Sequence, residues 1–228
     1  MIDNAILSRW SAAWNEGQMT GKAARSPRKA KGHGGERREE ILTAALRLFG
    51  EFGIHAVSTR QIAAAVGISQ PTLYAYFSTK DEIGEELHNR AFAQLAARLT
   101  QLPRSRILTQ EDLSAALKAY VDFGLEQPDA YRIAFMLETA THRTQFLTKP
   151  DLPAGSRESF GVLHQMVVAL HEQALTVDLD PDTLAQSLWA GLHGLVSLLI
   201  ARPGFPWVER QHLIDSHLGL LAGAVLRR

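Results

Sequence analysis

A short stretch of the chain carries polar side chains that are suited to reading DNA. Gln70, Thr72, Tyr74 and Tyr76 form hydrogen bonds, are uncharged, and are either short or planar. A helix that lies in the major groove of DNA needs such groups, because base edges and phosphates there are recognised by hydrogen bonds. These residue types therefore indicate nucleic-acid recognition by one exposed helix face.

Two short helices joined by a tight turn would position these side chains. In the first helix, Ile62, Ala63 and Val66 fall on one face, and Thr59 is the expected N-cap. Gly67 should end this helix, because glycine tolerates the positive φ found just past many helix ends.

The second helix of the pair starts at another hydroxyl residue. Ser69 is its expected N-cap, and Pro71 suits the opening turn, where the missing N–H costs little. Leu73 and Phe77, four residues apart, should anchor the helix to the core, with Ile68 packed beneath the turn.

A helix on each side would complete this unit. Residues 37–52 should form the helix that covers the pair, and Gly53 should end it. Ser78 or Thr79 can cap a fourth helix. The expected core residues of the first helix are Ile41, Ala45, Leu48, Phe49 and Phe52.

Residues 37 to about 87 resemble the DNA-binding domain of the TetR family of bacterial transcriptional regulators. The resemblance implies an all-α regulator with a helix-turn-helix domain at 36–82 and a helical ligand-binding and dimerisation domain at 83–228. The matching elements are Ile41-Leu42-x-Ala44-Ala45-x-x-Leu48-Phe49, Phe52-Gly53, Thr59-x-x-x-Ile62-Ala63, Val66-Gly67-Ile68-Ser69, Leu73-Tyr74-x-Tyr76-Phe77 and Lys80.

The candidate DNA contacts fall into two groups. Residues at the start of each helix should contact phosphates, and residues along the second helix should contact base edges. The phosphate candidates are Thr59, Arg60, Tyr76 and Lys80, the base-edge candidates are Gln70, Thr72 and Tyr74, and Ser69 belongs to the same surface.

The charge of the chain is unevenly distributed. It has 24 basic and 24 acidic residues, but residues 1–80 carry a net charge of +5 and residues 81–228 a net charge of −5. Residues 21–35 hold five basic side chains among Gly, Ala, Ser and Pro, so 1–35 is predicted to be a flexible basic arm. Such an arm either adds salt-dependent affinity for DNA or is a solubilising tail.

The remainder of the chain reads as helical, with no period-two alternation. A linker is expected at 104–109 and a loop at 148–156. The predicted helices are 79–102, 111–126, one from 129, 156–177, 181–201 and 207–226.

The last two predicted helices are apolar on more than one face. Leu188, Leu195 and Leu218 lie in apolar stripes, and small residues such as Gly191 and Gly194 would let another helix approach closely. A second copy of the chain is the simplest cover for such faces, whereas a monomer would have to bury them among its own helices. Trp189-x-x-x-His193-Gly194 resembles the Trp-His-Gly signature of one TetR subgroup.

A small-molecule effector site is expected between residues 105 and 202. Its candidates are aromatic residues and histidines, although such residues at helical spacing are also ordinary core. The candidates are Tyr120, Phe123, Tyr131, Phe135, Phe160, His164, His171 and Trp189, with Met136 and Met166 as further lining.

The sequence argues against catalysis, metals, cofactors and membranes. Neither a Gly-x-Ser-x-Gly elbow nor a glycine-rich phosphate loop is present, and there is no cysteine. His164 and His171 with His142 or His193, or Glu85-x-x-His88, would be incomplete metal sites. The most apolar run, 188–201, is 14 residues against the ~20 needed to span a bilayer.

These observations together predict a cytoplasmic, homodimeric DNA-binding regulator. Its partners would be a pseudo-palindromic double-stranded operator and a small molecule that releases it, which makes it a repressor. The alternative is a ligand-independent DNA-binding or structural protein whose C-terminal domain only dimerises.

Overall fold

The computed structural model describes residues 34–102, 107–136 and 154–227. Within these ranges the chain is helical without strands, and Thr176 and Leu226 form an isolated antiparallel bridge. The all-α prediction is therefore confirmed. The predicted arm lies outside the described residues, except for residues 34 and 35, which belong to the first helix. Most of the predicted loop at 148–156 also lies outside the described residues.

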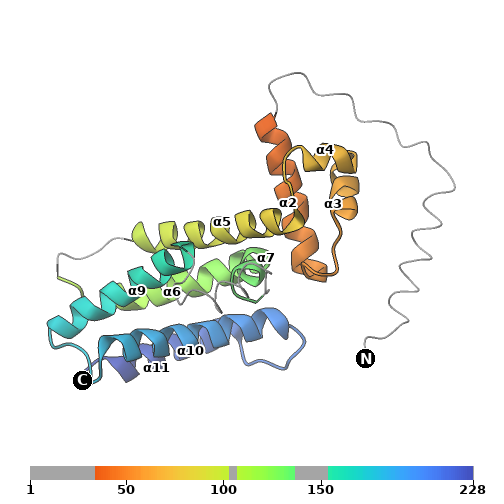
Figure 1. Cartoon of the computed structure of the whole chain (residues 1–228). Coiled ribbons are helices and arrows are strands. Elements are labelled where there is room, and N and C mark those ends of the chain that lie inside the picture. The colour runs from red at the N-terminus through yellow and green to blue at the C-terminus, as the bar shows by residue number, and fades with distance from the viewer. Residues whose placement is uncertain (1–33, 103–106, 137–153, 228) are drawn as a thin grey trace. The chain divides into compact units, whose positions relative to one another are not determined.

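Three helices gather around the first half of α5 (Lys80–Thr100), as Figure 1 shows. They are α2 (Gly34–Phe52), α3 (Thr59–Val66) and α4 (Gln70–Tyr74). Their apolar faces form a first core that excludes water from its centre. This core consists of Ile41, Leu42, Ala45, Leu48, Phe49, Ile54, Val57, Ile62, Ala63, Leu73, Phe77, Ile83, Leu87 and Ile133.

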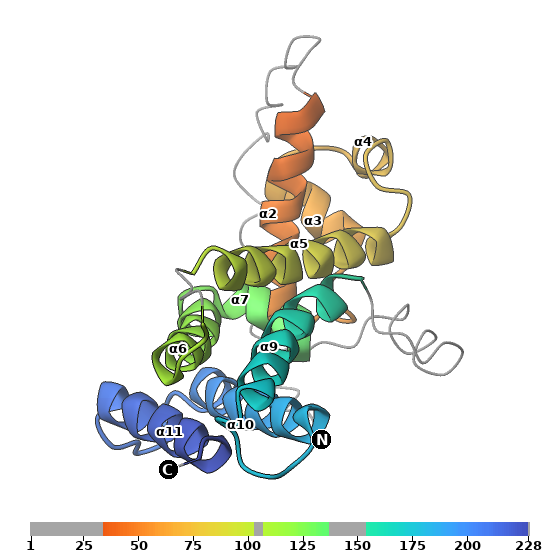
Figure 2. The same cartoon turned by 90° about the vertical axis from the view of Figure 1, so that its left-hand side faces the viewer.

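The remaining helices form a second core with the other half of α5. They are α6 (Gln110–Glu126), α7 (Pro128–Tyr131), the π-helical turn η1 (Arg132–Met136), α9 (Ala154–Glu172), α10 (Pro181–Ala201) and α11 (Arg210–Val225). Helix α9 packs on α5 and α10, and α6 packs on α5, α10 and α11 (Figure 2).

Two elements contribute to both cores. On α5, Ile83 and Leu87 belong to the first core, and Leu95 belongs to the second. The second element is the continuous segment of α7 and η1. Its Tyr131, at the end of α7, is buried in the second core, and its Ile133, in η1, is buried in the first core. A shift of either element would therefore disturb both cores, because close-packed interiors transmit displacement.

Local helix signals determine several boundaries as predicted. Ser69, Thr79 and Asp180 cap α4, α5 and α10 through their side-chain oxygens. Gly53 and Gly67 have φ of 81° and 70°, the left-handed conformation that favours glycine at a helix end. Helix α10 has the predicted bounds.

Three details of the predicted helix-turn-helix unit are wrong. The N-cap of α3 is Ser58 rather than Thr59, because Ser58 and Gln61 form a reciprocal capping box. Phe52 is 39% exposed and lies outside the core, where Leu42 is buried instead. Tyr76, expected on the exposed face, is half-buried against the first core.

Several other boundaries differ from the predictions. Helices α5 and α6 begin one residue away from the expected start, and α9 begins at Ala154 and ends at Glu172, five residues early. Helix α11 begins at Arg210 rather than at 207. The Glu209 carboxylate caps it by accepting hydrogen bonds from the backbone N–H of Gln211 and His212, at 2.8 and 2.6 Å.

Helix α10 is more apolar than its 14-residue run suggested. All 21 residues of Pro181–Ala201 form one helix, which by length and composition alone could cross a membrane. Its Leu184, Leu188, Leu192 and Val196 are buried in the second core, as expected of a core helix.

Candidate DNA interface and C-terminal cluster

The turn between α3 and α4 is held by backbone and hydroxyl hydrogen bonds. The N–H of Gly67 donates to Ala64 O at 3.1 Å, and that of Ile68 donates to Ala63 O at 2.9 Å. At the start of α4, Ser69 Oγ accepts from the Thr72 N–H at 3.2 Å and contacts Thr72 Oγ1 at 2.8 Å. The hydroxyl of Thr72 is therefore oriented on an exposed helix start.

Three of the candidate DNA residues meet in one polar cluster. Gln70 Nε2 donates to Thr59 Oγ1 at 3.0 Å and to the Tyr74 hydroxyl at 3.4 Å, and the two hydroxyls lie 3.3 Å apart. Hydrogen bonds from Thr59 and Gln70 lower the pKa of the Tyr74 hydroxyl. Both bonds engage the Nε2 end of the amide, which leaves Gln70 Oε1 as the group it can offer to a base.

A buried leucine, Leu73, supports this cluster from below. Leu73 is completely buried between Thr72 and Tyr74, both of which are exposed. Arg60 is exposed on the first turn of α3, and Ser69 is exposed at the turn. The structure therefore brings Thr59, Gln70 and Tyr74 together and leaves Arg60 directed toward solvent nearby.

Lys80 makes a contact that the sequence did not predict. Its ammonium donates to the backbone carbonyl oxygens of Ile54 and Val57, at 2.7 and 2.9 Å. These two bonds tie the start of α5 to the loop between α2 and α3. One ammonium hydrogen remains for a phosphate, so Lys80 can brace this loop and still have its predicted phosphate role.

Replacing Lys80 with methionine should therefore destabilise the first core. The stem is kept, but two buried carbonyls lose a charged donor, at a cost of roughly 1–3 kcal/mol in the free energy of unfolding. Urea unfolding measures this loss. An unchanged unfolding free energy, together with a salt slope of DNA binding reduced by about one, would instead assign Lys80 to phosphate contact.

An ion-pair network joins α2 to α5 and was missed by sequence reasoning. Arg38 forms a bidentate pair with Glu86, and Arg90 pairs with both Glu86 and Glu39. The hydrogen bond from Arg38 is the main reason that the pKa of Glu86 is lowered. The Arg38 guanidinium also lies 4.5 Å from the centre of the Phe77 ring. Only Glu86 and Arg90, at spacing i,i+4, carried a local signal.

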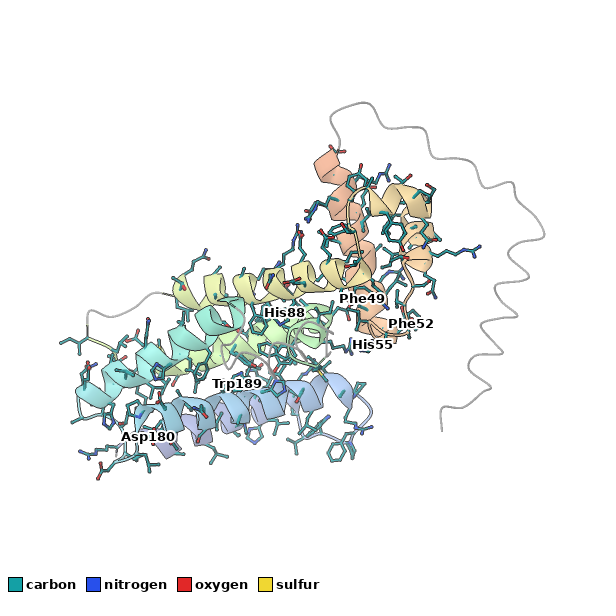
Figure 3. All side chains as sticks on the ribbon, in the orientation of Figure 1. Phe49, Phe52, His55, His88, Asp180 and Trp189 are labelled. Carbon is teal, nitrogen blue, oxygen red and sulfur yellow. The ribbon has the colours of Figure 1, made fainter. Side chains whose placement is uncertain are left out.

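The candidate effector residues are distributed unevenly in the second core. Tyr120, Phe123 and Tyr131 are buried, Phe135 and Phe160 are half-buried, and Trp189 is 39% exposed. Figure 3 shows Trp189 on α10. Ring contacts connect these residues, except Phe123, through a histidine that was absent from the candidate list. That histidine is His193, whose ring centroid lies 5.7, 5.6 and 6.1 Å from those of Tyr131, Phe135 and Trp189.

The other candidate histidines have local partners. His164 Nε2 lies 2.6 Å from Asp182 Oδ1, and its ring stacks near Phe160. His171 Nδ1 lies 2.7 Å from Thr176 Oγ1, away from the aromatic cluster. Among the described residues there is no group of three potential metal ligands, and His142 lies outside them.

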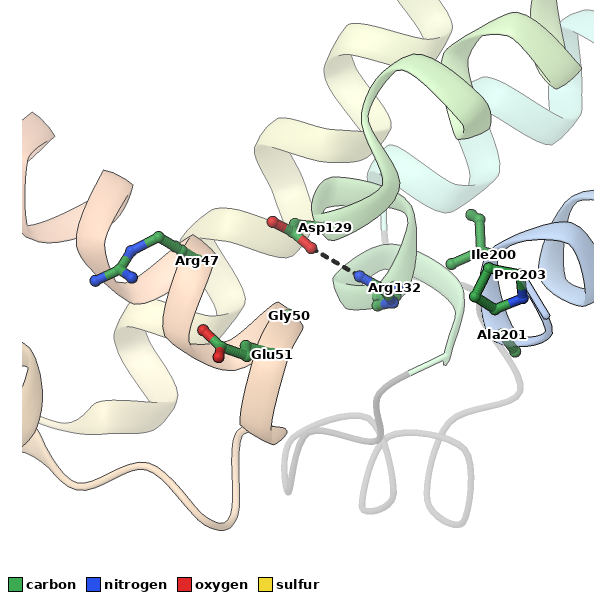
Figure 4. Close-up of a pocket in the computed structure, with 8 residues that line it drawn as sticks. All are labelled: Arg47, Gly50, Glu51, Asp129, Arg132, Ile200, Ala201 and Pro203. Carbon is green, nitrogen blue, oxygen red and sulfur yellow. Dashed lines mark hydrogen bonds and ion pairs between the residues drawn. The ribbon is translucent and has the colours of Figure 1, made fainter. Parts of the chain in front are cut away.

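An open pocket lies elsewhere, between α2, α7 and the end of α10. It has a volume of about 670 Å³ and contains none of the candidate effector residues. Figure 4 shows the ion pair between Asp129 and Arg132, 2.8 Å apart, on one of its walls. The Asp129 carboxylate packs against Gly50, where an added Cβ would lie 2.5 Å from Asp129 Oδ1. The pocket lining is Arg47, Gly50, Glu51, Asp129, Arg132, Ile200, Ala201 and Pro203.

Family models match both halves of this arrangement. The model described as bacterial regulatory proteins, tetR family, matches residues 41–87, and a tetracyclin repressor-like C-terminal domain model matches residues 113–219. The chain belongs to the TetR family. Members of this family are transcription regulators with a DNA-binding helix-turn-helix domain, and they are not enzymes.

Individual relatives agree with the TetR assignment. The chain is 31% identical over 119 residues to the HTH-type transcriptional activator FasR of Mycolicibacterium smegmatis, covering 52% of this chain and 51% of FasR. It is also 31% identical over 110 residues to the nucleoid occlusion factor SlmA of Haemophilus influenzae, covering 46% and 50%. The chain thus spans about half the length of the curated relatives it matches.

Solved structures share the fold. A bacterial regulatory protein of the tetR family from Rhodococcus RHA1 superposes with a TM-score of 0.69 at 17% identity, over 85% of this chain and 98% of that one. At this identity the likeness concerns the TetR fold alone.

Proposed function

We propose that the protein is a sequence-specific repressor that a small molecule releases from a pseudo-palindromic operator. The observation that carries the proposal is the partly exposed Thr59–Gln70–Tyr74 cluster, which stands on a fully buried Leu73. Hydrogen-bonding side chains on a rigidly supported helix are what major-groove recognition requires. Thr72, Ser69, Arg60, Tyr76 and Lys80 would supply the surrounding contacts.

Release by a ligand would act through the shared elements. Helix α5 and η1 have residues in both cores. A ligand that favours one position of these elements would therefore change the separation of the two DNA-binding domains in a dimer. Such a ligand must weaken DNA binding by the same factor by which DNA weakens ligand binding. The candidate effector residues are those of the aromatic cluster, with His164 beside Phe160 and with Phe123 and His171 outside the ring contacts.

The competing function is a ligand-independent DNA-binding protein whose C-terminal domain only dimerises. The burial of Tyr120, Phe123 and Tyr131 favours it, because a filled core leaves less room for an effector. The relatives also differ in their roles, since FasR is an activator and SlmA a nucleoid occlusion factor. For this chain we propose repression rather than activation. We also propose that it belongs to the Trp-His-Gly subgroup.

One experiment separates the two functions. Selection of bound duplexes from a random DNA pool should yield a two-fold symmetric site with half-sites about one helical turn apart. Operator affinity is then measured against a diverse small-molecule collection, with a reporter gene behind the selected site. Release by at least one compound supports the repressor, whereas stable binding throughout, with no reporter response, supports the alternative.

The second copy of the chain is proposed to dock on α10 and α11. Leu198 and Leu220 are 51% and 72% exposed on these helices. A Cβ added at Gly194, Gly219 or Gly223 would meet no atom within 4 Å, so these surfaces are open to another helix.

We also propose the cytoplasm as the location, because an operator would be accessible there. The proposed domains remain a basic arm at 1–35, a DNA-binding domain at 36–82 and a C-terminal domain at 83–228.

Other residues of the predicted interface serve the subunit itself. A Cβ at Gly191 would lie 2.7 Å from Leu221 Cδ2, so Gly191 allows α10 and α11 of the same chain to approach. Leu195 and Leu218 are buried in the second core. Substitutions at these positions would disturb folding as well as assembly, so they cannot test the interface.

Deletion of residues 1–35 is expected to weaken DNA binding and flatten its salt dependence. Five basic side chains at 21–35 would no longer displace counterions, so the slope of log K against log salt should fall by up to about 4–5. The base preference and the dimer should persist. Binding isotherms at several salt concentrations measure this, and an unchanged slope would make the arm a tail.

A further inference from the structure

A chain of hydrogen bonds runs through the aromatic cluster and ends at His193. The Tyr131 hydroxyl lies 2.7 Å from His193 Nδ1 and 3.0 Å from the Tyr120 hydroxyl. Three side chains, from α6, α7 and α10, are thus joined in one hydrogen-bonded chain.

The chemistry of these groups gives the chain a direction. A buried hydroxyl needs an acceptor for its hydrogen, and among the described residues the Tyr131 hydroxyl is the acceptor that Tyr120 reaches, so Tyr120 donates to Tyr131. The Tyr131 oxygen then accepts from Tyr120, and its O–H donates to His193 Nδ1. The opposite direction would leave a buried tyrosine hydroxyl without an acceptor in the described part of the chain.

The charge state of the chain agrees with this direction. Burial lowers the pKa of His193, and burial is also the main reason that the pKa values of Tyr120 and Tyr131 are raised. All three side chains are therefore neutral near pH 7. A neutral histidine that accepts at Nδ1 carries its proton on Nε2.

The Nε2 end of the chain is the less enclosed end. His193 is half-buried, whereas Tyr120 and Tyr131 are 5% and 0% exposed. Phe135, half-buried, and Trp189, 39% exposed, flank the imidazole, and no lysine or arginine of the described residues takes part in these ring contacts. Within the described residues, the Nε2–H has no acceptor.

We propose that His193 Nε2–H is the polar contact of the effector site, and that it binds the carbonyl oxygen of an uncharged, flat, largely apolar molecule. This inference rests on the proposed function, because it names the class of the releasing ligand. The rings of Phe135 and Trp189 would cover the apolar body of the ligand. A carboxylate is disfavoured, because among the described residues no cation acts on His193 to balance its charge.

Such a ligand would act close to the shared elements. Tyr131, which orients His193, lies two residues before Ile133, and Ile133 is buried in the first core. A ligand that moves His193 therefore displaces the end of α7 and, with it, a residue beneath the DNA-binding helices.

The first test is the tautomer of His193 in the full-length protein. Nitrogen-15 NMR of the imidazoles, assigned with a His193→Phe variant, should find Nε2 protonated and Nδ1 bare at pH 7. Tyr131→Phe should disturb this tautomer preference, whereas His212→Phe, an exposed histidine on α11, should leave the His193 signals unchanged. A His193 that carries its proton on Nδ1 would overturn the proposal.

The second test compares matched probes of one and two rings: acetophenone with ethylbenzene, and 2-acetylnaphthalene with 2-ethylnaphthalene and 2-naphthoate. At least one ketone should bind roughly 10-fold more tightly than its hydrocarbon, the order of one hydrogen bond. His193→Phe should abolish that difference, and His212→Phe should preserve it. Equal binding of ketone and hydrocarbon in both series, or preference for the naphthoate, would contradict the inference.

Operator affinity measured with the same probes separates this inference from the function it rests on. A ketone that needs His193 to bind but leaves operator affinity unchanged would support the site and contradict ligand release. A different compound that releases the operator equally from wild type and His193→Phe would support release and overturn the role of His193.

Discussion

Replacing Leu220 with glutamate is expected to separate the dimer and to abolish tight operator binding. The side chain is 72% exposed within one subunit, so the subunit itself should fold, but an unpaired carboxylate would be costly to bury between subunits. A monomer has one DNA-binding domain and contacts half of the operator. It loses the gain in affinity from joining two DNA-binding domains in one dimer, which is roughly 10²–10⁴-fold. Analytical ultracentrifugation and operator titration on the same sample measure both effects.

Two further variants make this result specific. Leu198→Glu on α10 should behave in the same way, because Leu198 is 51% exposed on the neighbouring helix. Ile107→Glu is the matched control, since Ile107 is 69% exposed but precedes α6. A monomeric Leu220→Glu protein with wild-type operator affinity would refute the link between assembly and binding. Dimers in both leucine variants would move the interface away from α10 and α11.

The Gln70→Ala variant is expected to lose affinity for the selected operator and to tolerate base changes at one symmetric pair of positions. Each lost base contact costs roughly 1–3 kcal/mol, and the two half-sites of a dimer roughly double that figure. Because the Nε2 end of the amide is held by Thr59 and Tyr74, Gln70 Oε1 should accept from adenine N6 or cytosine N4. Titration of single-substituted operators at one salt concentration measures the change.

The supporting residues should have smaller effects in the same direction. Tyr74→Phe removes one partner of the Gln70 amide, so discrimination at that base pair should weaken while binding to random DNA stays constant. Gln101→Ala, at the end of α5 and outside the cluster, is the control. Full discrimination in Gln70→Ala would assign base reading to Thr72 or to other side chains of α4.

Signals carried by neighbouring residues were sufficient to predict much of the fold. Asp180-Pro181 determined the start of α10, and Gly67 with Ser69 determined the turn between α3 and α4, because capping bonds join residues at most a few positions apart. The same proximity makes adjacent hydroxyls hard to distinguish. Ser58 rather than Thr59 caps α3, because Gln61 completes a capping box only with Ser58.

Only the tertiary structure determined the partners of the polar side chains. Lys80 binds carbonyls 23 and 26 residues away, and His193 meets Tyr131 across 62 residues of sequence. None of these three sequence separations follows the helical repeat, so no pattern in the sequence could reveal the contacts. Gly191 and Gly194 look equivalent in the sequence, yet one packs against Leu221 of its own chain and the other is open. Helical periodicity predicts which face of a helix is apolar, but which neighbour covers that face depends on the packing of the whole chain.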